Sequence, residues 1–197
     1  MSDSAAPFAQ TKYQVRFDQG AAGAARIGGG VDVLVWVDVL DGAGPVDGRA
    51  APRVPQEALD AVPEAAVVLL AGLTDARAVA AALLAEQERL GRRAALAIVA
   101  AGRADGGFAA DDVLAAGAVI DALAELGIDD TSPEAAVACA AYTGLRRAVV
   151  HLTTASVAGR EAVAAGADPA DVRAAAVSRG DATARIVRAG AAPAASA

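Results

Sequence analysis

Four charged side chains are candidates for chemistry because they lie where an apolar, strand-like segment meets a helix. Asp38 stands near the end of the β-branched segment 31–40, and Arg103 follows a second apolar run. Asp111 and Asp112 open the helical pattern that comes next. In open α/β sheets, strand carboxyl ends and helix N-termini converge on one crevice, where ligands bind. Carboxylates there suit Mg²⁺, which takes one or two of them together with water and substrate phosphate.

The same residues also have purely structural interpretations. Asp111 and Asp112 could cap their helix and stabilise its dipole, an effect worth about 1 kcal/mol, and Asp38 could be a turn residue at a strand end. His151 lies in the apolar stretch AVVHLTT, where a structural or surface role is expected. Because His151 and Cys139 are the single histidine and cysteine, no Cys/His metal signature exists.

Strands and helices that could position these residues alternate along the chain. Apolar or alternating patterns predict strands at 13–17, 31–40, 65–70, 94–101 and 183–188. Helical patterns cover 56–61, 75–91, 109–126, 132–142, 157–165 and 169–178, whereas 19–30 is loop or short helix and 146–154 is of uncertain type. This alternation predicts an α/β fold, a three-layer α/β/α sandwich with a mostly parallel or mixed central sheet.

Three of the expected helices carry a start signal. Asp75 is a candidate cap, Ser132 precedes Pro133, and Asp168 precedes Pro169. Serine and aspartate side chains accept N–H groups of a first helical turn, and proline is favoured at the first helical position. We therefore expect helices to begin at these three places.

Length and composition favour one substantial domain over residues 1–197, with loose ends at 1–11 and 189–197. The chain is 55% hydrophobic but only 3% aromatic, so its core must be built from small side chains. A net charge of −7 and a single lysine, Lys12, argue against nucleic acid as the main partner. Every apolar run is too short for a membrane span. Together with the lone Cys139, the absence of a signal peptide predicts a cytoplasmic protein.

The segment AGR followed by GGFAADDVLAAGAVIDAL resembles the AG…G…EDxxxAGAI segment of the ComB family, the 2-phosphosulfolactate phosphatases. SPEAAVACAAY resembles the helix that follows it in that family. Four further stretches match in the family's order: YQVRFDQGAAGA, VDVLVWVDVL, AGLTDARAVA and SVAGREAVAAGADPADV. The resemblance covers nearly the whole chain and implies a ComB-like fold.

The family consists of Mg²⁺-dependent phosphatases that hydrolyse (R)-2-phospho-3-sulfolactate, so the resemblance implies phosphomonoester hydrolysis with Mg²⁺ as cofactor. It assigns the metal to Asp38 and Asp112, with Asp111 standing where the family has a glutamate. The metal would neutralise the phosphoryl oxygens and activate a water for in-line attack. Asp38 and Arg103 are the implied catalytic residues.

Matching positions also imply residues that bind a small anionic phosphoester. Arg16 and Arg103 would steady the anion, and Ser156 with Gly159 matches further family positions. The resemblance favours a homodimer as the oligomeric state.

Departures from the family pattern leave the function open between alternatives. The arginine and hydroxyl residues after the family's strand are replaced here by Asp41 to Gly44, and Leu73–Asp75 stands for its LRN segment. The family's SPNG-type loop has no counterpart before Pro63. An anionic substrate needs cationic or N–H donors. The alternatives are therefore a catalytically degenerate homologue acting as a binding or scaffold protein, or a phosphatase for a smaller phosphoester.

Overall fold

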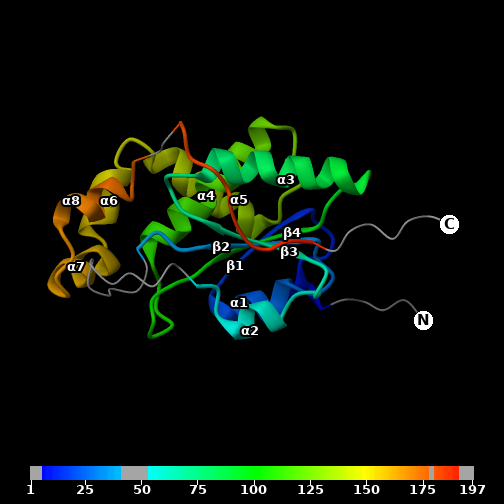
Figure 1. The fold of residues 1–197 in the computed structure, drawn as a ribbon, viewed down its shortest axis with the longest axis horizontal. Coiled ribbons are helices and arrows are strands. Elements are labelled where there is room, and N and C mark those ends of the chain that lie inside the picture. The colour runs from blue at the N-terminus through cyan, green and yellow to red at the C-terminus, as the bar shows by residue number, and fades with distance from the viewer. Residues whose placement is uncertain (1–5, 41–52, 178–179, 191–197) are drawn as a thin grey trace.

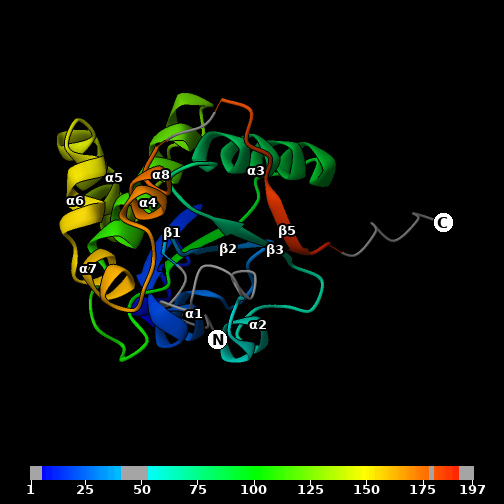
Figure 2. The same ribbon diagram turned by 60° about the vertical axis from the view of Figure 1, so that its left-hand side comes forward.

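The computed structural model describes residues 6–40, 53–177 and 180–190, which form a five-stranded mixed sheet covered by helices. The strand order is β1-β4-β2-β3-β5. Four strands run parallel: β1 (Val15–Gln19), β4 (Leu96–Ala100), β2 (Val33–Val37) and β3 (Val67–Ala71). The last strand, β5 (Arg185–Arg188), pairs antiparallel with β3 at one edge, as Figure 2 shows.

Helices cover both faces of the sheet, so the fold is the predicted α/β/α sandwich (Figure 1). One face carries α1 (Gly20–Ile27) and α2 (Gln56–Asp60). The other carries α3 (Ala76–Leu90), α4 (Ala110–Glu125) and α5 (Pro133–Leu145). Parallel strands with helices on both faces are buried on both sides, which explains why their sequences are continuous apolar runs.

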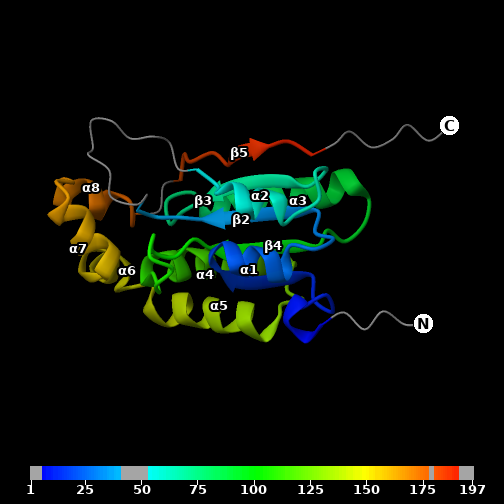
Figure 3. The same cartoon turned by 90° about the horizontal axis from the view of Figure 1, so that it is seen from below.

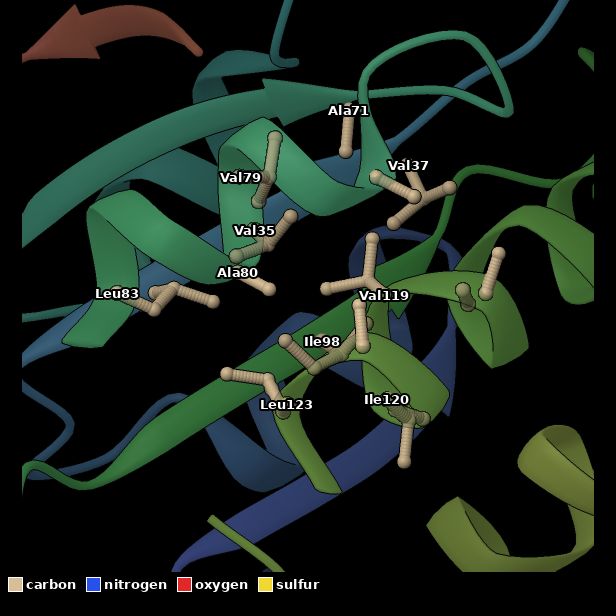
Figure 4. Packing of buried hydrophobic residues seen from close by; sticks show 14 of the residues in the cluster. Val35, Val37, Ala71, Val79, Ala80, Leu83, Ile98, Val119, Ile120 and Leu123 are labelled. Carbon is tan, nitrogen blue, oxygen red and sulfur yellow. The ribbon is translucent and has the colours of Figure 1, made fainter. Parts of the chain in front are cut away.

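Alternate strand residues form two hydrophobic cores, because successive side chains point to opposite faces of a sheet. Figure 4 shows the first core, where Val35 and Ile98 meet Leu83 of α3 and Val119 of α4. On the other face, Leu34, Trp36, Val68 and Val99 pack with Ala24 and Ile27 of α1 and Ala58 of α2. Both cores are dominated by valine, leucine, isoleucine and alanine, as the composition requires.

Three short helices gather beyond the carboxyl ends of the parallel strands (Figures 1 and 3). They are α6 (Val149–Ala155), α7 (Val157–Ala164) and α8 (Pro169–Ala174). A 3₁₀ turn, Pro7–Ala9, precedes β1 at the other end of the sheet. The three helices therefore stand at the edge of the sheet where α/β folds bind ligands.

The predicted elements largely agree with the observed ones, including the final strand near residue 185. The segment left as loop or short helix after β1 is α1, and the segment of uncertain type after α5 contains α6. Ser132 and Asp168 cap as expected: Ser132 Oγ accepts from Ala135 N at 3.1 Å, and Asp168 Oδ1 accepts from Ala170 N at 2.7 Å. No helix in the described ranges has the length and apolarity needed to cross a membrane.

Asp75 stands at the predicted helix start but does not cap α3 with its side chain. Its Oδ1 accepts from Gly72 N at 2.7 Å, and its Oδ2 accepts from Arg185 Nε at 3.1 Å. The carboxylate is 5% exposed, and Arg185 belongs to β5. Asp75 therefore ties the edge strand to the loop that precedes α3.

Candidate active site

A cleft with a volume of about 850 Å³ opens at the carboxyl ends of β2 and β4. The predicted residues Asp38, Arg103, Asp111 and Asp112 all line it. Further walls come from the first residues of α1, the loop before α2, and α7. The structure thus brings together four of the predicted site residues at the edge of the sheet where the sequence placed them. We call this hollow the acidic cleft.

Asp112 joins the two strand-end loops to the first turn of α4. Its Oδ1 accepts from Val39 N at 2.9 Å, just after β2, and its Oδ2 accepts from Gly102 N at 3.0 Å, just after β4. Burial raises the pKa of the Asp112 carboxyl well above its usual range. The charges of Asp111 and Asp38 raise this pKa further, and the two N–H donors lower it in part.

Asp111, the adjacent residue, is fully buried, yet neither of its carboxylate oxygens has a hydrogen-bond partner among the described residues. Ser156 Oγ lies nearby but donates to Thr153 O at 2.9 Å. Burial raises the pKa of the Asp111 carboxyl, while the Ser156 hydroxyl and the residue's own N–H lower it in part. A buried carboxylate without partners requires a proton or a cation.

Neither acid caps α4 through its side chain, since Ala109 occupies the cap position and α4 has no side-chain cap hydrogen bond. The capping interpretation of Asp111 and Asp112 is therefore wrong as a hydrogen-bond assignment. Both residues do lie in the first turn, where negative charge interacts favourably with the helix dipole.

Asp38 follows β2 directly, and its backbone N–H donates to Ala71 O at 3.0 Å. This bond extends the pairing of β2 with β3 by one residue and holds Asp38 at the rim. Its charge acts on Asp112 across the cleft. The segment from Asp41 to Gly44, which replaces the family's arginine, lies outside the described residues.

Arg103 lies in the glycine-rich loop between β4 and α4, where Gly102 and Gly106 have positive φ angles of 76° and 79°. Its Nη2 contacts Asp105 Oδ2 at 2.9 Å and Glu161 Oε1 at 3.1 Å. Its Nε is buried and has no hydrogen-bond partner in the described part of the chain. Arg103 is thus a cleft cation held between two carboxylates through a single nitrogen.

Arg16 is placed outside the cleft. Its Nη1 donates to Ile27 O at 3.1 Å and to Gly29 O at 3.2 Å, and the side chain is 5% exposed. Asp32, at the opposite end of β2, is the charge that acts on it. These bonds fasten β1 to the end of α1.

Ser156 and Gly159 lie next to the cleft rather than in its wall. Ser156 caps α7: its Oγ accepts from Gly159 N at 2.9 Å. A Cβ at Gly159 would collide with Thr153 O, so this position requires glycine. Their observed contacts fix the α6–α7 junction beside Asp111.

Sequence reasoning missed three charged residues of the acidic cleft: Arg53, Glu57 and Glu161. Arg53 and Glu57 come from the proline-containing segment before and within α2, and Glu161 comes from α7. Nothing in their local sequence marks them, because their position depends on the packing of distant segments. With them, the described lining holds five carboxylates and two arginines.

The donor set fits Mg²⁺ in its usual protein mode, with one or two carboxylates completed by water and phosphate. The unpartnered oxygens of Asp111 are the main argument, and Asp38 offers a second carboxylate at the rim. Asp112 has both oxygens engaged by backbone N–H groups. Within the described ranges, no group of three or more acidic, histidine or cysteine side chains is arranged to hold a metal ion.

A family model described as 2-phosphosulpholactate phosphatase matches residues 56–181. Because this match spans more than half of the chain, the protein belongs to that family. The matched range contains Arg103, Asp111 and Asp112, whereas Asp38 precedes it. No curated protein matches the chain.

Proposed function

We propose that this protein hydrolyses a phosphomonoester in the acidic cleft with the help of Mg²⁺, in the manner of a 2-phosphosulfolactate phosphatase. The observation that carries the proposal is the buried carboxylate of Asp111, which has no hydrogen-bond partner in the described residues. Membership of a phosphatase family supports a cation as the missing partner. We propose further that residues 1–197 form one ComB-like domain.

Asp111 and Asp38 are the residues we expect to hold Mg²⁺. When bound, Mg²⁺ would neutralise the phosphoryl oxygens and activate the attacking water. Asp112 is expected to act mainly as a positioning residue, since its oxygens hold the N–H groups of Val39 and Gly102. These bonds fix both strand-end loops relative to α4, which pre-organises the cleft.

Hydrolysis forms a bond from the water oxygen to phosphorus and breaks the ester P–O bond, so that the alcohol leaves with a proton and inorganic phosphate remains. Arg103 is suited to bind the phosphoryl oxygens, because a guanidinium matches phosphate in charge and geometry. Arg53 is a second cation in the wall and makes no ion pair within the described residues.

The charges of the cleft favour a second candidate substrate class. Five carboxylates face two arginines, and one arginine is already paired with acids. Because the described lining has five carboxylates against two arginines, it stays net negative even with one Mg²⁺ bound, and each further anionic group on a substrate adds to the repulsion. A smaller phosphoester with a single anionic group fits this balance better than 2-phosphosulfolactate does.

Release of inorganic phosphate tests the proposal. Wild-type protein is incubated with 2-phosphosulfolactate or with a generic phosphomonoester, each with Mg²⁺ and with a chelator. We expect Mg²⁺-dependent release from at least one of the two. Preference for 2-phosphosulfolactate would assign the family substrate, and preference for the generic ester would assign the smaller class.

Calorimetric titration with Mg²⁺ distinguishes the enzyme from the remaining alternative, a catalytically degenerate binding or scaffold protein. Absence of both turnover and Mg²⁺ binding would reject the enzyme and leave a binding or scaffold protein. Retained Mg²⁺ binding without turnover of either ester would reject both substrates while leaving the metal site in place.

A further inference from the structure

Arg103 has two N–H donors on one edge of its guanidinium, Nε and Nη2, and of these only Nη2 has acceptors among the described residues. In a side-on guanidinium contact, Nε and Nη2 bind two oxygens of one anion. Arg26 uses this edge on Asp18, with both bonds at 2.7 Å, and Arg89 uses it on Glu86, with both at 2.6 Å. Arg103 instead makes its contacts through Nη2, while its buried Nε has no acceptor in the described chain.

The two carboxylates on Arg103 have different origins. Asp105 belongs to the same loop, and its Oδ1 also accepts from Gly107 N at 2.9 Å, so it shapes the loop itself. Glu161 comes from α7, a separate element of the cleft wall, and its Oε1 contacts Arg103 Nη2 at 3.1 Å. The Glu161 side chain is 54% exposed, so it can turn into solvent at little cost.

We propose that Glu161 is a specificity-determining residue that occupies, on Arg103, the place of the substrate's phosphoryl group. The inference rests on the proposed function, because it takes the incoming group to be a phosphate. A tetrahedral oxyanion offers two oxygens to Nε and Nη2 together and thereby supplies the acceptor that Nε lacks. Glu161 then swings away, and every anion must first displace it.

In this arrangement, Glu161 competes with incoming anions for Arg103 and thereby excludes those that bind Arg103 weakly. A group with a single available oxygen gains no more from Arg103 than Glu161 already does, whereas a phosphoryl group gains the second bond. Removing the Glu161 charge should therefore strengthen anion binding without altering the chemical step. In kinetic terms, KM falls and kcat stays the same.

Inorganic phosphate binding, measured by calorimetry on the full chain, provides a test that needs no turnover. We expect Glu161→Gln to tighten binding by up to about fivefold, the upper end of the range for an exposed ion pair. Glu57→Gln is the matched control: it removes the same charge from another exposed glutamate of the cleft, one without an ion pair to Arg103 in the described residues. We expect this control to change affinity less than twofold.

The double variant Arg103→Gln/Glu161→Gln should bind phosphate no more tightly than Arg103→Gln alone, because the inference requires the effect of Glu161 to act through Arg103. Equal affinities of wild type and Glu161→Gln, equal gains in Glu161→Gln and Glu57→Gln, or a gain that persists without Arg103 would each overturn it. Circular dichroism checks that each variant is folded.

Parallel assays of phosphate release distinguish this inference from the proposed function. If a phosphomonoester is turned over, Glu161→Gln should lower its KM by up to about fivefold with kcat unchanged. If no ester is turned over but phosphate binding tightens through Arg103, the phosphatase proposal fails and the role of Glu161 stands. An unchanged KM in an active enzyme would overturn the role of Glu161 alone.

Discussion

Asp111 and Asp112 are adjacent buried aspartates, and we predict opposite effects of one substitution at the two positions. Asp112→Asn replaces one acceptor oxygen by an NH₂ group that faces the backbone N–H of Val39 or Gly102. A buried donor left without an acceptor costs about 1–3 kcal/mol, so we expect this variant to lose about 2 kcal/mol of unfolding free energy. Asp111→Asn breaks no hydrogen bond among the described residues and removes a buried charge, so it should keep or gain stability.

Thermal unfolding of the metal-free protein, followed by circular dichroism in a chelator, measures the difference. For a chain of this length, about 1 kcal/mol shifts Tm by about 2–4 °C. Asp112→Asn should therefore unfold about 4–8 °C below wild type, and Asp111→Asn at the wild-type temperature or above. A larger fall in Tm for Asp111→Asn than for Asp112→Asn would refute the account in which Asp112 holds the strand-end loops and Asp111 awaits a cation.

Three further predictions concern the fold. Gly117→Ala should lower the free energy of unfolding by about 1–3 kcal/mol, because a Cβ there collides with Ala138 O between α4 and α5; Gly144→Ala, in open space on α5, is the control that should not. Arg185→Ala should lower the free energy of unfolding by about 1–2 kcal/mol, because it removes one of the two donors that buried Asp75 has among the described residues, and an unchanged urea midpoint would contradict this. Burial raises the pKa of both adjacent aspartates of α4, so the folded state holds their protons more tightly. Stability of the metal-free protein should therefore fall as pH rises from the usual aspartate range through these raised values, and urea unfolding at several pH values would contradict this by showing a rise.

Local sequence was sufficient to predict most elements, because a buried strand is a short apolar run and a helix shows its own period. The runs at 31–40 and 94–101 contain β2 and β4, and the run at 65–70 covers β3 except for its last residue, Ala71. The sheet order was not predictable, since β4 lies between β1 and β2 through pairing of segments far apart in sequence. Likewise, a start signal located Asp75 correctly but could not tell that its carboxylate would bond Gly72 and Arg185.

The candidate site was predictable where it depends on strand ends. Asp38, Asp111 and Asp112 face one cleft because β2 and β4 are parallel neighbours whose carboxyl ends meet. The place of Arg16 was not predictable in the same way. It lies on β1 and was expected to bind the anionic substrate, but its guanidinium donates to backbone carbonyl groups at the end of α1. Glu161 was not predictable, because α7 reaches the cleft only through tertiary packing.

The central claim is that Asp111 holds a catalytic cation, and phosphate release by substituted protein tests it most directly. Initial rates are measured with Mg²⁺, on the better of the two phosphoesters, for wild type, Asp111→Asn and Asp121→Asn, the last being a half-buried acid of the same helix outside the cleft lining. We predict Mg²⁺-dependent turnover by wild type and Asp121→Asn, and a loss of about 100-fold or more in Asp111→Asn. Turnover by Asp111→Asn at the wild-type rate would contradict the account.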